Sequence, residues 1–129
     1  MLHVAVGVLF DAGGQVLIAR RKRDAHQGGL WEFPGGKVEA GESVLAALRR
    51  ELLEELDVQV NDAEPLMQIA HDYGDKRVLL DVWRVIDFNG EAQGKEGQPL
   101  AWVNTEQLGD YTFPQANFAI VDSLQRSAS

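Results

Sequence analysis

The chain of 129 residues contains no cysteine, and basic residues are scarce: 12 lysines and arginines stand against 20 aspartates and glutamates. The lack of cysteine excludes disulfides, thiolate zinc sites and a cysteine nucleophile. It also fits a reducing compartment, and we expect a cytoplasmic protein. No apolar run approaches the roughly 20 residues of a membrane-spanning helix. The N-terminus reads MLHVAVGVLF and lacks the basic segment of a signal peptide. We therefore expect no contact with a membrane.

The deficit of positive charge limits the partners that the chain can bind. Its net charge is −8 and its pI is near 4.7. Binding to a nucleic-acid polymer draws on clustered lysine and arginine, so this chain would be repelled by one. A small anionic substrate is compatible with the charge if metal ions and a few local basic residues neutralise it. The same charge also keeps a protein soluble.

The length and the 45% hydrophobic content suffice for one domain with its own core, and we expect a single domain over residues 1–129. Apolar patterning and turn signals predict strands at 4–10, 16–21, 30–33, 66–73, 78–87 and 100–103. A helix is predicted over 44–56 with Ser43 as its N-cap, a short helix over 105–108, and a last helix from Pro114 to about 125. Strands outnumber helices and are mixed with them, which favours a layered α+β fold.

Three glutamates of the predicted central helix share one face. Glu51, Glu54 and Glu55 stand at i, i+3 and i+4, a spacing at which like charges destabilise an isolated helix by roughly 0.2–0.5 kcal/mol per pair. A solvated acidic surface is the ordinary explanation for such a run. A hard divalent cation offers another, because Mg²⁺ takes oxygen ligands and shares its remaining positions with water and substrate phosphates. The spacing makes these residues candidate ligands of Mg²⁺, with Mn²⁺ as a substitute.

The run GKVEAGESVLAALRRELLEELDV, from Gly36 to Val58, resembles the Nudix box. The box consists of Gly, five residues, Glu, seven residues, Arg-Glu, an aliphatic residue, any residue, Glu-Glu, any residue, Gly and an aliphatic residue. The positions that fit are Gly36, Glu42, Arg50, Glu51, Leu52, Glu54, Glu55 and Val58. Asp57 replaces the second glycine, and aspartate is among the residues that tolerate positive φ. The resemblance implies an α/β/α sandwich with a mixed sheet and a loop-helix-loop that binds metal.

Three further segments are similar to the MutT branch of this family: 33–37 (FPGGK), 94–99 (GKEGQP) and 113–117 (FPQAN). The resemblance implies a monomeric enzyme that hydrolyses a nucleoside triphosphate, preferably 8-oxo-dGTP, to a monophosphate and pyrophosphate. Other Nudix substrates, such as ADP-ribose or a dinucleoside polyphosphate, are alternatives because substrate choice lies outside the box. A non-catalytic nucleotide-binding module is a further alternative, but it would be expected to have lost box carboxylates. No D-x-[DN]-x-[DN]-G calcium loop occurs.

The resemblance also assigns roles around the metal. Arg50 would orient Glu51 and contact Glu42, since a ligating carboxylate works best when a neighbour fixes its rotamer. An ordinary surface pair with Glu54 is the alternative for Arg50. The Gly35 carbonyl would add a metal ligand. Glu96 would approach the metals and serve as general base, a role for which Glu54 also qualifies.

Substrate contacts follow from the same resemblance. Arg21 and Lys37 would bind phosphates, and strand alternation implies that Arg20 points away from Arg21. Asn117 would recognise the purine, because an amide offers both donors and an acceptor. Phe33 either stacks on the base or packs in the core. Solvated or structural side chains are the alternative in each case. Two histidines, His26 and His71, lack a partner at metal-ligand spacing and receive no role.

Overall fold

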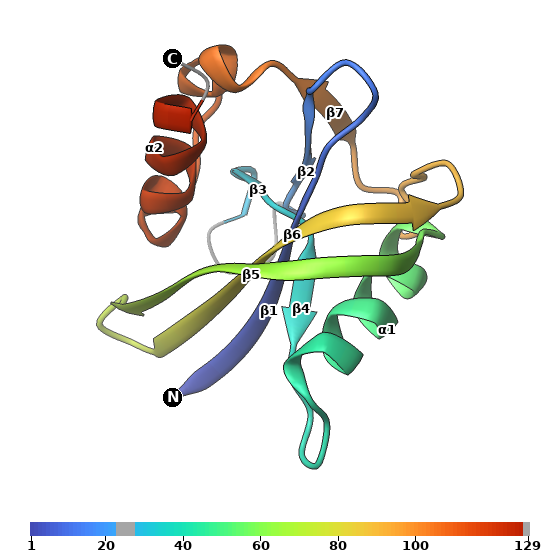
Figure 1. The fold of residues 1–129 in the computed structure, drawn as a ribbon. Coiled ribbons are helices and arrows are strands. Elements are labelled where there is room, and N and C mark those ends of the chain that lie inside the picture. The colour runs from blue at the N-terminus through green and yellow to red at the C-terminus, as the bar shows by residue number, and fades with distance from the viewer. Residues whose placement is uncertain (23–27, 128–129) are drawn as a thin grey trace.

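The computed structural model describes residues 1–22 and 28–127 (Figure 1). Its strands are β1 (Leu2–Leu9), β2 (Val16–Arg20), β3 (Trp31–Glu32), β4 (Gly35–Lys37), β5 (Gln59–Asp72), β6 (Arg77–Asn89) and β7 (Leu100–Val103). Its helices are α1 (Val44–Leu56) and α2 (Phe118–Ser127), with 3-10 helices η1 (Thr105–Asp110) and η2 (Gln115–Asn117). No helix within the described ranges is long and apolar enough to cross a membrane.

The strands form two sheets. The larger is mixed and has the order β4-β1-β6-β5, with β1 parallel to β6 and the other pairs antiparallel. The smaller is antiparallel, with the order β3-β2-β7. Figure 1 shows α1 and α2 on opposite sides of the larger sheet. This arrangement confirms the predicted layered fold with a mixed sheet. The separation of three strands into a second sheet was not predicted.

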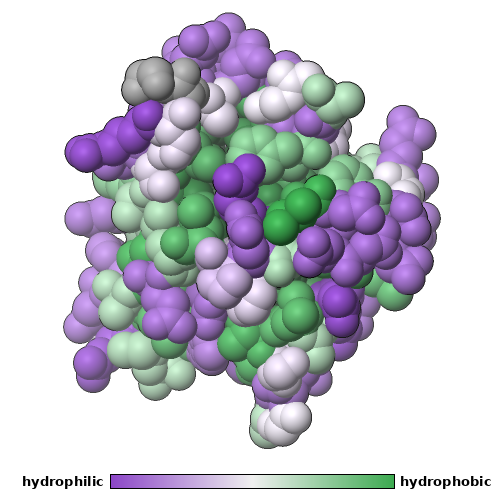
Figure 2. All heavy atoms as spheres, viewed as in Figure 1, coloured by the Kyte–Doolittle hydropathy of each residue, from purple (hydrophilic) through white to green (hydrophobic). Residues whose placement is uncertain are grey.

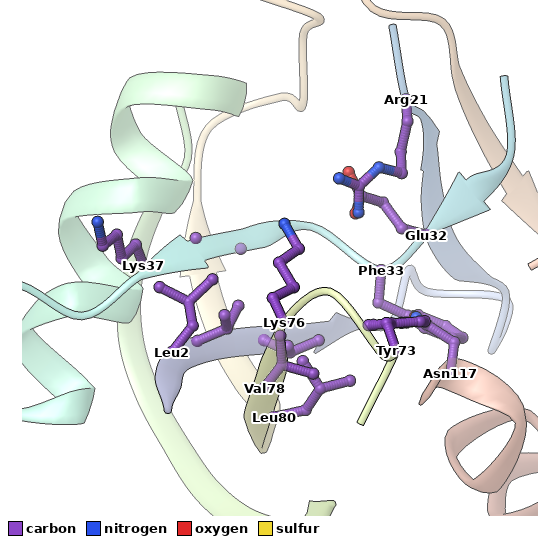
Figure 3. A pocket seen from close by; sticks show the side chains of 14 residues that line it. Leu2, Arg21, Glu32, Phe33, Lys37, Tyr73, Lys76, Val78, Leu80 and Asn117 are labelled. Atoms are coloured by element: carbon purple, nitrogen blue, oxygen red, sulfur yellow. The ribbon is translucent and has the colours of Figure 1, made fainter. Parts of the chain in front are cut away.

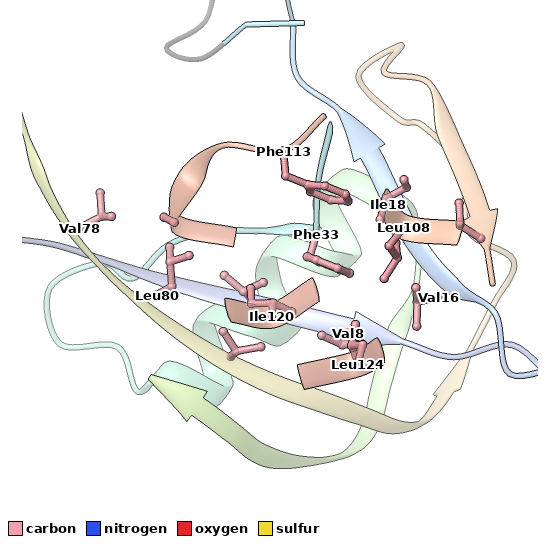
Figure 4. Packing of buried hydrophobic residues seen from close by; sticks show 14 residues of the cluster. Val8, Val16, Ile18, Phe33, Val78, Leu80, Leu108, Phe113, Ile120 and Leu124 are labelled. Atoms are coloured by element: carbon pink, nitrogen blue, oxygen red, sulfur yellow. The ribbon is translucent and has the colours of Figure 1, made fainter. Parts of the chain in front are cut away.

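Alternation along β1 explains how one sheet supports two helices. Val6 and Val8 pack in a core cluster with Ile120 of α2 (Figure 4). Ala5 and Leu9 point the other way and join the cluster formed with α1. Successive side chains of a strand alternate between faces, so an almost continuous apolar strand supplies both layers. The core therefore lies on both sides of the larger sheet, and β1 runs through its centre.

Helix α1 has the predicted bounds, and local chemistry accounts for its beginning. The Ser43 hydroxyl accepts a hydrogen bond from the Ala46 amide at 3.1 Å, which satisfies one of the unpaired donors of the first turn. Leu48, Leu52 and Leu56 are fully buried against the sheet. The apolar stripe fixes the rotation of the helix. As a result the three glutamates lie beside the stripe rather than beneath it.

Helix α1 ends at Asp57, the residue that departs from the box. Its φ is 59° and its ψ is 36°, so it adopts the left-handed conformation that glycine usually supplies. Its amide donates to the carbonyls of Leu52 and Leu53. Asp57 is the one non-glycine residue with positive φ in the described part of the chain. Aspartate thus fulfils the backbone role of the missing glycine.

Strand β4 corrects one prediction. The predicted strand ended at residue 33 and no strand was predicted after it, but Gly35–Lys37 forms a strand that pairs with β1. A Cβ on Gly35 would overlap the Ala5 carbonyl, and the Gly35 φ is 155°. Glycine therefore serves a close approach of two backbones here rather than a turn. This pairing places Gly36, the first residue of the box, beside Ala5 of β1.

The bounds of strand β5 also differ from the prediction. It begins at Gln59 rather than at 66, and it forms the outer edge of the larger sheet. Polar residues such as Asp62 and Glu64 hide the strand from a search for apolar patterns, and register shifts interrupt its pairing with β6. Figure 2 shows the molecule from the same side as Figure 1, with hydrophobic residues near the middle of the view and hydrophilic residues both among and around them. The last helix also begins later than predicted, at Phe118, because 115–117 form a 3-10 turn.

Replacement of Asp57 by glycine tests the account of the helix end. We expect Asp57→Gly to raise the free energy of unfolding by about 0.5–1 kcal/mol, because a left-handed residue with a Cβ is strained by roughly that amount. The same substitution at Asp122, inside α2, should lower it by about 1 kcal/mol, since glycine weakens a right-handed helix. Urea unfolding of both variants measures the difference. Equal signs for the two substitutions would contradict the assigned conformation.

Candidate functional site

The acidic face of α1, formed by Glu51, Glu54 and Glu55, lies beside β4. The Glu51 side chain is only 15% exposed, and its carboxylate occupies the space that a Cβ on Gly36 would need. Any larger residue at Gly36 would displace it. Glu54 is 61% exposed and projects towards solvent. The glycine that opens the box thus serves to admit Glu51 against the backbone of β4.

Arg50 ties this face to the loop before α1. Its Nε and Nη2 donate to the two carboxylate oxygens of Glu42 at 2.8 and 2.9 Å, and its Nη1 donates to Glu51 at 2.8 Å. Its Nη2 also donates to the Lys37 carbonyl at 3.0 Å, while Glu54 lies 3.5 Å away. The hydrogen bonds from Arg50 lower the pKa of Glu42 to about 2 and raise the pKa of Arg50 itself. Arg50 therefore orients Glu51 and does more than form an ordinary surface ion pair with Glu54.

Negative charge concentrates around Glu55. Burial raises the pKa of Glu55 to about 8, and it is the largest cause of the shift. The charge of Glu51 and a hydrogen bond with Glu51 act in the same direction. The charges of Glu32 and Glu96 add to this shift. Four carboxyl groups from three separate segments therefore act on the same space, near the negative end of the α1 dipole. Such a site favours a cation.

The donor chemistry fits a hard divalent cation, because the cluster offers carboxylate oxygens, and Gly35 has a backbone carbonyl next to Gly36, which lies against Glu51. Within residues 1–22 and 28–127, however, no three acidic or histidine side chains are arranged to hold one ion together. Arg50 helps to keep the carboxylates apart, since it contacts both Glu51 and Glu54 and compensates their charge. The acidic face supplies the ligand types, and side-chain rotation would have to bring them together.

A cavity of about 230 Å³ opens beside the acidic face, and we call it the Asn117 cavity (Figure 3). Apolar side chains such as Val4 and Leu80 line one part of it, and Phe33, Tyr73 and Asn117 line another. Asn117 is only 8% exposed. Its side-chain amide has no hydrogen-bond partner among the residues that the structure describes. The amide is therefore available to a molecule that enters the cavity.

A second cavity of about 190 Å³, the Glu96 cavity, is lined by Glu55, Glu96 and Gln98. Arg21 and Glu32 line both cavities, so the two meet at this pair. Arg21 Nη1 donates to Glu32 at 3.0 Å, and burial outweighs this contact and raises the pKa of Glu32. The buried Nε of Arg21 has no partner in the described structure. The cation between the cavities thus retains an unused donor.

Other predicted residues differ in their surroundings. Lys37 and Gly35 line the Asn117 cavity. Phe33 also lines it, but is 3% exposed and stacks on Phe113 at 5.5 Å between ring centroids, so it belongs to the core as well. Arg20 is exposed and donates to the Gly29 carbonyl, and it lines the Glu96 cavity together with Arg21, although strand alternation implied that only one of the two would reach the site. His26 lies outside the described residues, and His71 packs edge-on against the ring of Tyr73.

Sequence reasoning missed three residues of these cavities. Glu32 precedes Phe33 in the segment WEFPGG, and its position beside that motif was the available signal. Tyr73 and Lys76 come from the connection between β5 and β6, which carries no motif. They reach the cavity through the pairing of β6 with β1, a contact between distant parts of the chain. Local patterning does not reveal such a contact.

Comparison with known proteins gives concordant results. The family model described as the NUDIX domain matches residues 5–123. The chain is 36% identical to the 8-oxo-dGTP diphosphatase of Escherichia coli strain K12, over 97% of both chains. It is 35% identical to the CTP pyrophosphohydrolase of the same organism, over 92% of this chain and 88% of the relative.

Solved structures agree with this result. MutT, from work on Aliivibrio salmonicida and Vibrio cholerae, matches with a TM-score of 0.87 at 35% identity, over 98% of both chains. The match extends over the fold and over the segments that carry the acidic face and both cavities. With the box residues placed as described above, the chain belongs to the Nudix hydrolase family, in its MutT-like branch.

Proposed function

We propose that the chain is a Mg²⁺-dependent nucleoside triphosphate pyrophosphohydrolase that converts 8-oxo-dGTP and water to 8-oxo-dGMP and pyrophosphate. The observation that carries the proposal is the junction of two cavities at Arg21. One cavity offers the free amide of Asn117, and the other faces Glu55 and Glu96. A nucleotide with its base in the first and its phosphates towards the second suits this division. The activity of the Escherichia coli relative supports the same substrate.

The proposed reaction uses the carboxylates of the chain in two ways. Glu51, Glu54 and Glu55, with the Gly35 carbonyl and Glu96, would hold Mg²⁺, which neutralises and aligns polyphosphate when bound. Glu96 or Glu54 accepts the proton of the attacking water. The water oxygen bonds to the β-phosphorus, and the bond from that phosphorus to the oxygen bridging the α-phosphate breaks. The nucleoside monophosphate leaves with the bridging oxygen.

Binding and orientation fall to the remaining residues. Arg21 binds phosphate oxygens, for which its unpartnered Nε–H is available. Lys37 adds a second cation at the rim. Asn117 pairs with the purine edge, where its amide serves as donor and acceptor. Arg50 keeps Glu51 in place through its contacts with Glu42 and the Lys37 carbonyl.

A pyrimidine triphosphate is the second candidate substrate. The observation that favours it is the similarity to a CTP pyrophosphohydrolase, at nearly the same identity as to the 8-oxo-dGTP diphosphatase. Both substrates carry the same triphosphate, so the acidic face does not distinguish them. A screen of 8-oxo-dGTP, dGTP, CTP, ADP-ribose and a dinucleoside polyphosphate, with release of monophosphate and pyrophosphate measured in Mg²⁺, ranks the candidates directly.

Neutralisation of the acidic face should abolish most turnover. We expect Glu54→Gln and Glu55→Gln each to lower kcat by about 100-fold or more, because a lost ligand charge removes several kcal/mol of transition-state stabilisation. Circular dichroism should show an intact fold. Glu106→Gln, an exposed glutamate on η1, is the matched control and should retain wild-type activity. Wild-type rates for either acidic-face variant at saturating Mg²⁺ would contradict the metal assignment.

Metal binding should also appear in stability. Because the carboxylates repel one another, a bound cation stabilises the folded chain by RT ln(1 + [L]/Kd). We expect millimolar Mg²⁺ or Mn²⁺ to raise the Tm of the wild type and to shift the Glu55→Gln variant less. Differential scanning calorimetry with and without metal measures both. An equal shift in the two proteins would place the stabilising ion elsewhere.

Base recognition and phosphate binding should separate in kinetics. Asn117→Ala should weaken the preference for 8-oxo-dGTP over dGTP by about 5- to 100-fold, because an unmatched buried polar group costs roughly 1–3 kcal/mol. Arg21→Ala should lower kcat/KM for both nucleotides by similar factors, since both carry the same triphosphate. The measurement is kcat/KM for the two nucleotides in both variants. An unchanged preference in Asn117→Ala would remove Asn117 from base recognition.

A further inference from the structure

Two hydrogen bonds attach the loop of residues 94–99, which we call the Glu96 loop, to the last turn of α1, and a third lies within the loop. The Lys95 amide donates to the Glu55 carbonyl at 3.0 Å. The side-chain Nε2 of Gln98 donates to the same carbonyl at 3.1 Å. The side-chain Oε1 of Gln98 accepts from the Glu96 amide at 2.9 Å. One glutamine side chain therefore connects the backbones of two proposed metal-binding glutamates.

The chemistry of this contact leaves one orientation for the amide of Gln98. The Glu55 carbonyl can only accept and the Glu96 amide can only donate, so a flipped side chain would make neither bond. The contact also meets a requirement of the helix, because the last four carbonyls of a helix lack intrahelical partners. The Glu96 loop thus supplies hydrogen-bond donors to the last turn of α1, and it also places the Glu96 carboxylate in the lining of the Glu96 cavity.

Glu96 lies between two glycines in a tight turn of this loop. Gly94 and Gly97 flank the residue, the φ of Gly97 is 81°, and the Gly97 amide donates to the Gly94 carbonyl in a tight turn. Glu96 itself is exposed. Near one end of the loop the Lys95 amide donates to the Glu55 carbonyl, and at the other end the Pro99 carbonyl accepts from the Arg20 amide at 3.0 Å. The bond from Gln98 fixes the residue between these anchors.

We propose that Gln98 is a positioning residue, which fixes the backbone of Glu96 to the carbonyl of Glu55 and so sets the distance between their two carboxylates across the Glu96 cavity. Gln98 touches neither substrate nor reacting atoms in this role, and it acts through Glu96. The catalytic consequence rests on the function proposed above, whereas the structural coupling does not. Loss of the side chain should free Glu96 and leave the outer anchors of its loop in place.

Amide hydrogen exchange tests the coupling without reference to activity. Gln98→Met keeps the length of the side chain and removes both hydrogen bonds. We expect the Glu96 amide to exchange about three- to tenfold faster in this variant, as expected for the net contribution of one hydrogen bond. The matched control is Gln93→Met, because Gln93 is exposed and its hydrogen bonds are made by its backbone, whose amide donates to the Leu56 carbonyl and whose carbonyl accepts from the Lys95 amide. Unchanged exchange at Glu96 in Gln98→Met would overturn the proposal.

A double-mutant cycle tests the route to catalysis. We expect Gln98→Met to lower kcat by up to about 100-fold, the cost of misplacing a catalytic group by roughly 1 Å. Glu96→Gln should lower it as well, and Gln98→Met should cause no further loss in the Glu96→Gln background, because Gln98 acts through Glu96. Gln93→Met should be neutral in both backgrounds. Independent, multiplicative losses would overturn the positioning role.

The two proposals can fail separately. Full activity of Glu96→Gln would refute the proposed chemistry of Glu96, while exchange at the Glu96 amide would still decide whether Gln98 holds the loop. Reduced activity of Glu96→Gln together with wild-type activity of Gln98→Met would spare the proposed function and overturn the positioning role of Gln98. A general loss of stability in Gln98→Met, seen as faster exchange throughout α1 and the sheet, would equally overturn it.

Discussion

The site depends on the guanidinium of Arg50. It joins the loop before α1 through Glu42, the backbone of β4 through the Lys37 carbonyl, and the acidic face through Glu51. A helix that presents three carboxylates on one face repels itself, and Arg50 offsets part of that repulsion from inside the cluster. The same contact therefore stabilises the loop-helix unit and keeps Glu51 oriented.

The arrangement of the cavities separates two tasks that a nucleotide-hydrolysing enzyme must perform. Carboxylates gather where the end of α1 meets the Glu96 loop, and the apolar walls and the amide of Asn117 lie beyond the Arg21–Glu32 pair. Arg21 lies where the two regions join, with one nitrogen bound to Glu32 and another unpartnered. Changes in the Asn117 cavity could thus alter base selection while leaving the acidic face unchanged. This separation is consistent with the two similar relatives, one of which is an 8-oxo-dGTP diphosphatase and the other a CTP pyrophosphohydrolase.

Much of this could be predicted from the sequence, because the box lies within one helix and its flanking loop. The bounds of α1, the left-handed Asp57 and the contact of Arg50 with Glu42 all depend on residues close together along the chain. The elements that were missed depend on distant partners. Strand β4 exists because Gly35 approaches Ala5, and Tyr73 lines a cavity because β6 lies beside β1. Single-sequence patterns carry little information about such pairings.

Strand β5 has a consequence for the behaviour of the chain at high concentration. As an outer strand of 14 residues it carries a row of backbone groups that another chain could pair with, the usual origin of edge-to-edge aggregation. Pro65 removes one donor from that row, Asp62 and Glu64 add charge, and the register shifts twist the strand locally. The polar residues and register shifts that kept β5 out of the predicted strands are thus the same features that oppose pairing of its open edge with another chain.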